Sequence, residues 1–63
     1  MLEQASLREQ LLDLLAKEKQ AEQTYADLEA NQEDSQLKEQ IKQLRREKQR
    51  HINLTERLLE ILD

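Results

Sequence analysis

The sequence predicts an all-α protein whose two helices fold back on each other as an antiparallel hairpin. Three observations lead to this fold class. Leu, Ala, Glu, Gln, Lys and Arg dominate the 63 residues, with no Gly or Pro. Two apolar stripes recur at heptad spacing, and a short polar segment separates them. The dominant residue types lose little rotamer freedom in a helix, and this composition is typical of coiled coils.

The first helix is predicted over residues of about 2–30. Its apolar residues occupy heptad positions d, a, d, d, a and d, and they are Leu7, Leu11, Leu14, Ala21, Tyr25 and Leu28. Glu18 takes the remaining a position. Ser6 and Glu9 match the capping box that opens many helices, although Ser6 could equally lie inside a helix that begins at Leu2. Both alternatives stay open.

A turn is predicted at about residues 31–35. Leu28 and Leu37, which end the first stripe and begin the second, are nine residues apart. At about 100° per residue, this spacing places the two stripes on opposite sides of a straight helix. Asn31 suits the left-handed conformation after a helix C-terminus. Asp34 or Ser35 could cap the next helix.

The second helix is predicted over residues of about 36–62. Its frame has Leu37, Ile41, Leu44, His51, Leu58 and Leu62 at d, a, d, d, d and a. Lys48 and Thr55 take the other two a positions. His51 is interpreted as a polar core position, because a catalytic base would need a nucleophile and a concave pocket.

Folding back near residue 33 makes the two frames meet in matched layers. The expected layers are Leu28–Leu37, Tyr25–Ile41, Ala21–Leu44, Glu18–Lys48, Leu14–His51, Leu11–Thr55 and Leu7–Leu58, flanked by Glu29–Lys38, Glu22–Arg45, Lys17–Glu47 and Leu15–Ile52. Glu18 and Lys48 thereby form a polar core pair. In a parallel homodimer each would face its own copy, which is unfavourable. The alternative architecture is a single continuous helix in a parallel dimeric coiled coil.

Further apolar residues lie outside the strict a and d positions, mostly towards the two chain ends. They include Leu15, Ile52, Leu54 and Ile61. One partner helix cannot cover all of them, and exposed apolar patches usually mark association sites. We expect two hairpins to pair through the end that holds both termini, as a four-helix bundle.

The leading functional hypothesis is a protein–protein interaction and oligomerisation module, which acts as a non-catalytic scaffold or docking segment. Its partners would be a second copy, most simply in a homodimer, or another helical protein. The alternative is a small nucleic-acid-binding regulator. That reading rests on Lys42, Arg46 and Arg50, a candidate anion-binding stripe at i, i+4 and i+8. A solvated face is favoured for the stripe, because the net charge is −4 and Tyr25 is the only aromatic residue.

Several function classes have no supporting residues in the sequence. It suggests no catalytic residues, cofactor or small-molecule ligand. The single His and the absence of Cys argue against a metal site. No apolar run approaches the ~18 residues of a membrane span, and no signal peptide is recognisable, so an intracellular location is the default expectation. The helical pattern already runs at Leu2 and still runs at Leu62, as in an excerpt from a longer protein.

Overall fold

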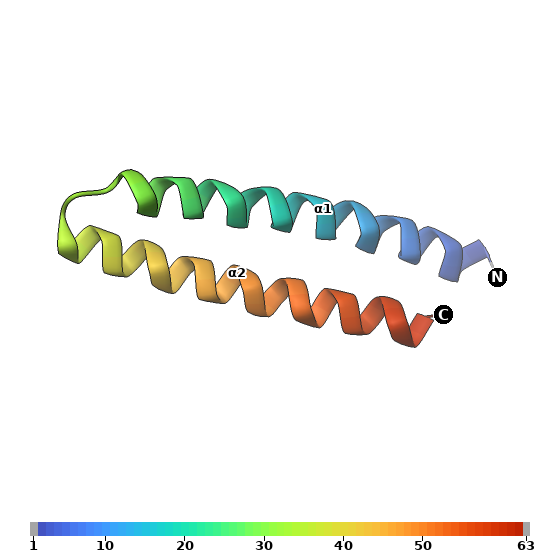
Figure 1. Cartoon of the computed structure of the whole chain (residues 1–63). Helices are drawn as coiled ribbons and strands as arrows, with labels where there is room; N and C mark the ends of the chain where they lie inside the picture. Colours follow the sequence, from blue (N-terminus) through green and yellow to red (C-terminus); the bar gives the residue numbers. More distant parts are fainter. Residues whose placement is uncertain (1, 63) are drawn as a thin grey trace.

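The computed structural model is a hairpin of two antiparallel helices (Figure 1). Helix α1 spans Leu2–Asn31 and helix α2 spans Ser35–Leu62. The structure describes residues 2–62, and the side chains of residues 5–62. The Cα atoms extend over 50 × 14 × 11 Å, with both chain ends at one tip and the turn at the other. The predicted hairpin is confirmed, and the continuous-helix alternative is wrong.

The N-terminal part of α1 does not use the capping box. Because α1 begins at Leu2, Ser6 and Glu9 both lie inside the helix, so the interpretation of Ser6 as the helix start is wrong. Leu, Glu, Gln and Ala precede Ser6, and all four are good helix formers that allow the helix to start earlier.

The end of α1 is closed by side-chain and backbone hydrogen bonds. The Asn31 side-chain amide donates to the Asp27 carbonyl oxygen at 2.9 Å, and the Gln32 N–H donates to the Glu29 carbonyl oxygen at 3.3 Å. None of residues 2–62 has a positive φ. The expected left-handed residue at Asn31 is therefore wrong. Asn31 remains helical, and its side chain donates back to the carbonyl oxygen of the residue one turn earlier, Asp27.

The turn comprises residues 32–34, and Asp34 caps α2. The Asp34 carboxylate accepts a hydrogen bond from the Leu37 N–H at 3.0 Å, which satisfies one of the free donors at the helix start. The Asp34 N–H in turn donates to the Gln32 side-chain oxygen at 3.0 Å. Polar side chains thus close the turn without glycine.

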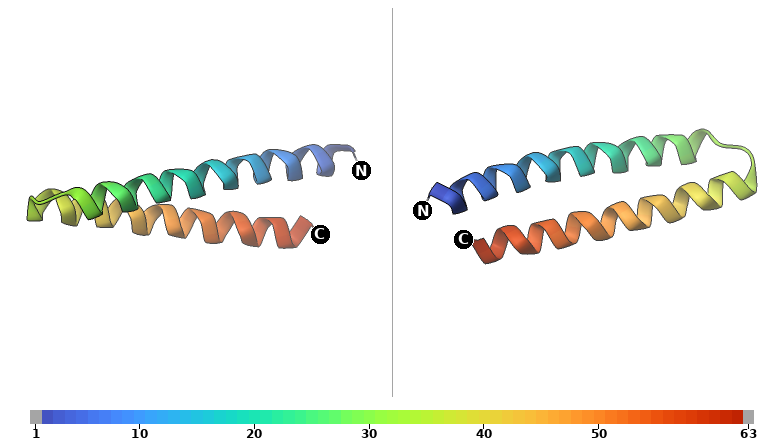
Figure 2. Two further views of the ribbon diagram at one scale, coloured as in Figure 1. Left: turned by 45° about the horizontal axis from the view of Figure 1, so that its top comes forward. Right: turned by 180° about the vertical axis from the view of Figure 1, so that it is seen from behind.

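The two helices run side by side along most of their length, and the N-terminal end of α1 projects past the end of α2 (Figure 2). The residues that face the opposite helix are spaced three and four apart, and they are buried or half-buried. In α1 they are Arg8, Leu11, Leu15, Glu18, Glu22, Tyr25 and Glu29, with Ala21 and Ala26 beside them; Gln32 continues the row in the turn; in α2 they are Lys38, Ile41, Arg45, Lys48, Ile52, Thr55, Leu59 and Leu62. We call this set the seam. It combines the predicted a positions with the e positions.

The expected a/d packing within the hairpin is therefore wrong at every d position except Ala21. Leu7, Leu14, Leu28, Leu37, Leu44, His51 and Leu58 are exposed, as are the flanking Leu54 and Ile61. The physical reason lies in the e positions. Leu15, Ile52 and Leu59 are apolar at e, and Glu22 and Arg45 carry opposite charges there. Turning e towards e brings these complementary side chains together.

The best-packed part of the seam lies towards the chain ends. Ile52 is only 4% exposed, and Leu59 and Thr55 are also buried. The Thr55 hydroxyl donates to the His51 carbonyl oxygen at 2.9 Å, so its burial leaves no unsatisfied donor. The apolar residues Leu11 and Leu15 of α1 contribute to this half of the seam.

We predict that Asp34→Ala lowers the free energy of unfolding by about 0.5–2 kcal/mol, because the Leu37 N–H loses its acceptor. Chemical denaturation followed by circular dichroism at a fixed chain concentration measures this loss. Ser35→Ala is the matched control, since Ser35 is the other predicted cap but lies inside α2. An equal loss in both variants would contradict the assignment of Asp34 as the cap.

Candidate interaction surface

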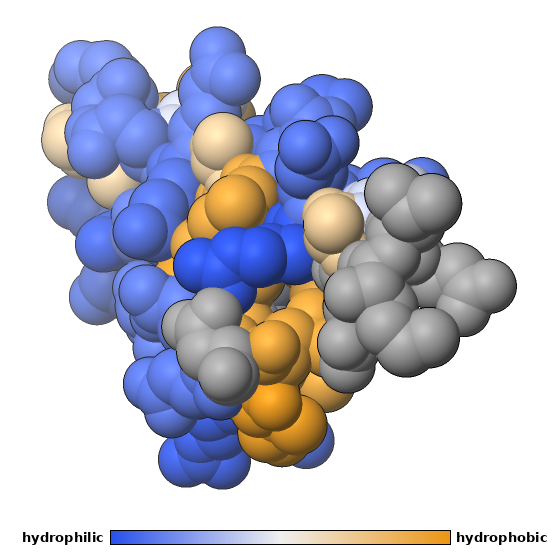
Figure 3. Space-filling model, turned by 90° about the vertical axis from the view of Figure 1, so that its right-hand side faces the viewer, coloured by the Kyte–Doolittle hydropathy of each residue, from blue (hydrophilic) through white to orange (hydrophobic). Residues whose placement is uncertain are grey.

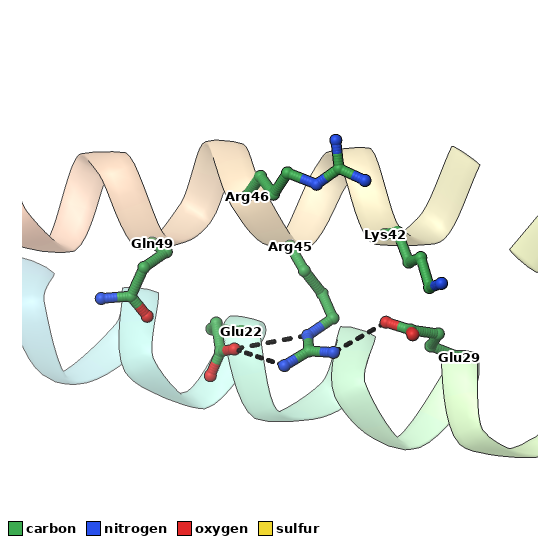
Figure 4. Close-up of a pocket in the computed structure, with 6 residues that line it drawn as sticks. All are labelled: Glu22, Glu29, Lys42, Arg45, Arg46 and Gln49. Carbon is green, nitrogen blue, oxygen red and sulfur yellow. Dashed lines mark hydrogen bonds and ion pairs between the residues drawn. The ribbon is translucent and has the colours of Figure 1, made fainter. Parts of the chain in front are cut away.

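Arg45 of α2 lies between two carboxylates of α1 in the half of the seam near the turn (Figure 4). Its Nη1 atom donates to Glu29 Oε1 at 2.7 Å, and its Nε and Nη2 atoms each lie 3.4 Å from Glu22 Oε1. The Glu29 side chain is 13% exposed. The predicted pair of Glu22 with Arg45 is present, whereas Glu29 meets Arg45 rather than the expected Lys38.

This arrangement changes the acidity of Glu29. The hydrogen bond from Arg45 is the main cause that lowers the pKa of Glu29 below its ordinary value of 4.5. Partial desolvation opposes the change, while the positive charges of Arg45, Lys42 and Lys38 reinforce it. The same hydrogen bond raises the pKa of its donor, Arg45. The charged pair is thus favoured over its neutral form.

The side of the hairpin that carries Arg45 also holds an open depression of about 450 Å³. It is lined by Glu22, Glu29, Lys42, Arg45, Arg46 and Gln49 (Figure 4). Two residues of the candidate anion-binding stripe, Lys42 and Arg46, therefore stand beside carboxylates. Arg46 also lies 3.4 Å from Glu39, and Arg50 is exposed. The structure places acidic groups within the stripe, which weakens its attraction for phosphates.

An ion pair between the helices shows which residues continue the side with the depression towards the chain ends. Lys19 Nζ lies 3.8 Å from Glu56 Oε2, although the two residues belong to different helices. Both lie one residue after a seam residue, as Lys42 and Gln49 do. Residues with this offset therefore line one face of the hairpin, which we call the polar face.

The opposite face carries the unpaired leucines. Leu7, Leu14 and Leu28 of α1 and Leu37, Leu44 and Leu58 of α2 occupy the d positions, and we call these six residues the leucine face. Around the helix axis, a residue at position d lies about 60° from position a and about 100° from position e. The residue that follows a, which belongs to the polar face, lies on the other side of the seam. Because the polar face is shared by both helices, the two rows of leucines share the other face.

The leucine face extends over the full length of the hairpin. Its members are 42–51% exposed. Leu28, Leu37 and Leu44 lie in the half near the turn, so exposed apolar residues extend beyond the chain ends, where most of them were expected. The end of the hairpin opposite the turn also exposes apolar side chains. Figure 3 shows hydrophobic side chains between the two helices there, reaching the surface on one side.

Charged residues lie at the centre of the hairpin, where the predicted polar core pair was placed. Glu18 Oε2 is buried, lies 3.9 Å from His51 Nδ1, and has no hydrogen-bond donor within the described part of the chain. Lys48 is half-buried. Among residues 5–62 no ion pair joins Glu18 to Lys48, so the structure does not form the expected pair within one chain. His51, at the d position of α2, lies closer to the Glu18 carboxylate than Lys48 does.

The described residues form neither a metal site nor a membrane-spanning helix. No three His, Cys, Asp or Glu side chains of this part of the chain converge in a way that could hold a metal ion. Neither helix is both long and apolar enough, over the same residues, to cross a membrane. Comparisons with protein-family models, with curated proteins and with solved structures gave no match.

The a/d reading of the sequence left several seam residues out of the core. The a/d pattern places Glu22, Glu29, Lys38 and Arg45 among the flanking charges, and it leaves Leu59 outside the a and d positions. The signal that could have placed them is the pairing of e positions, apolar with apolar at Leu15 and Ile52 and acidic with basic near the turn. In the half near the chain ends, each helix has apolar residues at adjacent d and e positions, as in Leu14–Leu15 and Leu58–Leu59, and a/d spacing alone does not say which of them faces the other helix of the same chain.

We predict that Arg45→Gln makes the hairpin less stable at pH 7 and that this effect is smaller at pH 3. A lowered pKa of Glu29 contributes stability above its unfolded-state pKa near 4.5, and this contribution disappears as the pH falls through the folded-state pKa. Urea midpoints of wild type and variant at both pH values measure the change.

Arg46→Gln is the control for this pH experiment, because Arg46 lines the same depression but pairs with the exposed Glu39 of its own helix. It should change the midpoint little at either pH. A midpoint difference between wild type and Arg45→Gln that is the same at pH 7 and pH 3 would contradict the role assigned to the Glu29–Arg45 pair.

Proposed function

We propose that this protein is a non-catalytic oligomerisation module whose leucine face binds the leucine face of a second copy. The product is a four-helix bundle of two hairpins. The observation that carries the proposal is the row of six half-exposed leucines that line a single face from the turn to the chain ends. The exposed polar His51 stands between Leu44 and Leu58 in this face, and exposed leucines grouped on one face usually mark an association site.

The size of the face supports a stable dimer. With Cα extents of 50 × 14 Å, one face covers about 700 Å² before side chains are added. This is the outline of the whole face, of which the leucines form a part, and it is of the same order as the ~800 Å² of accessible surface that each partner buries in a typical specific interface. A second copy has the same length and the same spacing of leucines, so it can cover all six leucines at once.

The heptad pattern supports the same partner. In a four-helix bundle each helix contacts two neighbours, and its a and d residues point towards the bundle centre. Here the a/e seam already contacts the neighbour within the chain. The d residues are the remaining half of such a core, and they need a neighbour that presents apolar residues at the same seven-residue spacing. A second copy of this hairpin meets that requirement.

We predict that Leu14→Gln weakens the dimer roughly a hundredfold. Each dimer contains two copies of Leu14, and burial of a leucine contributes about 1.5–3 kcal/mol. The side chain is 46% exposed in the single hairpin, so the substitution leaves the seam intact. Sedimentation equilibrium over a dilution series measures the dissociation constant, and circular dichroism verifies that the helix content is kept.

Leu12→Gln is the matched control for Leu14→Gln. Leu12 is 45% exposed, lies in the same helix, and stands seven residues before Lys19, on the polar face. Its substitution should leave the dissociation constant nearly unchanged. A wild-type chain that remains a folded monomer at millimolar concentration would remove the proposal, and so would an equal weakening by both variants.

A further inference from the structure

We infer that the two copies pair with their turns at the same end of the bundle, so that α1 of each copy lies against α2 of the other. This inference rests on the proposed dimer and specifies its geometry. It follows from the charges at the centre and along the outer margin of the leucine face.

Twofold symmetry allows only two ways to stack two leucine faces. In the first, the axis runs along the bundle, the turns lie at the same end, and α1 is the neighbour of α2 from the partner copy. In the second, the axis crosses the bundle, the turns lie at opposite ends, and each helix lies against its own counterpart. The two arrangements bury the same leucines, so apolar burial alone does not choose between them.

The outer margin of the leucine face distinguishes the two arrangements. Lys17 lies three residues after Leu14, and Glu47 lies three residues after Leu44. Both are exposed and stand near the middle of their helices. The residue three positions after d borders the neighbouring helix of the other copy. With the turns together, each Lys17 meets Glu47 of the partner copy. With the turns apart, Lys17 meets Lys17 and Glu47 meets Glu47.

The central layer favours the same arrangement. Glu18 and Lys48 occupy a positions at mid-length and point towards the bundle centre. With the turns together, acid and base alternate around this layer, and each Glu18 gains Lys48 of the partner copy as a neighbour. With the turns apart, adjacent helices place Glu18 beside Glu18 and Lys48 beside Lys48, which is unfavourable at core positions.

The buried oxygen of Glu18 adds a second reason. Its Oε2 atom is buried and has no hydrogen-bond donor within the described residues of the hairpin. An unsatisfied buried carboxylate oxygen is costly. When α1 lies against α2 of the partner copy, the ammonium group of the partner's Lys48 can donate to this oxygen. When α1 lies against α1, no such donor is present, because no lysine of α1 in the described residues occupies an a position.

A spin label at position 33 tests the arrangement directly. The chain contains no cysteine, so Glu33→Cys gives a single labelling site in the exposed turn. With the turns together, the two labels lie roughly 10–20 Å apart, about the spacing of packed helices. With the turns at opposite ends, they lie about 50 Å apart, the length of the hairpin. Pulsed dipolar spectroscopy separates these distances.

A charge exchange at the margin gives an independent readout. Lys17→Glu should weaken the dimer roughly tenfold, because two attractive pairs between the copies become repulsive. Within α1 the substitution also replaces the 2.9 Å ion pair of Lys17 with Asp13 by a repulsive pair, and circular dichroism verifies that the helix content is kept. Lys17→Glu combined with Glu47→Lys should bring the dissociation constant back to within about threefold of wild type. Lys19→Glu is the matched control, since it makes the same charge change in α1 on the polar face, and it should not weaken the dimer.

The outcomes separate this inference from the proposed function. A dimer with labels near 10–20 Å and restoration by the double exchange supports the arrangement. A dimer with labels near 50 Å, or an exchange that fails to restore binding, overturns the arrangement while the oligomerisation function stands. Sedimentation of the labelled and wild-type chains as monomers at every concentration overturns both.

Discussion

The rotation of each helix about its own axis is the constraint on which this structure depends. In the half near the turn, that rotation is set by Arg45 of α2, which lies between Glu22 and Glu29 of α1. In the half near the chain ends, it is set by the burial of Ile52 and Leu59. The ionic and the apolar contacts select the same edge of each helix, so one rotation satisfies both halves of the seam.

The same rotation exposes the leucines. A helix of this chain has apolar residues on an arc wider than one neighbour can cover, and facing e towards e leaves the d row outside. In an isolated hairpin this exposure is unfavourable, since each buried leucine would contribute about 1.5–3 kcal/mol. The arrangement is well suited to a four-helix bundle, where each helix needs one edge for the neighbour in its own chain and another for the partner copy.

The polar residues at the centre fit this division of surfaces. Glu18 and Lys48 would be poor choices for a two-helix core, and the hairpin alone leaves an oxygen of Glu18 without a donor. Charged residues at a positions commonly fix register and orientation at some cost in stability. Their place at mid-length, together with Lys17 and Glu47 at the margin, gives the two possible dimers very different charge contacts.

The sequence alone determined the helices and the fold-back. Residue propensities, the half-turn change of stripe between Leu28 and Leu37, and the polar segment with Asp34 depend on short-range spacing, which is visible in the chain. The tertiary structure decided which edge of each helix faces the other. Leu14 and Leu15 are adjacent apolar residues, and so are Leu58 and Leu59, and local pattern is equally satisfied by either. Only the simultaneous fit of Ile52, Arg45 and their partners across the seam selects one, because that choice depends on contacts between residues far apart in the chain.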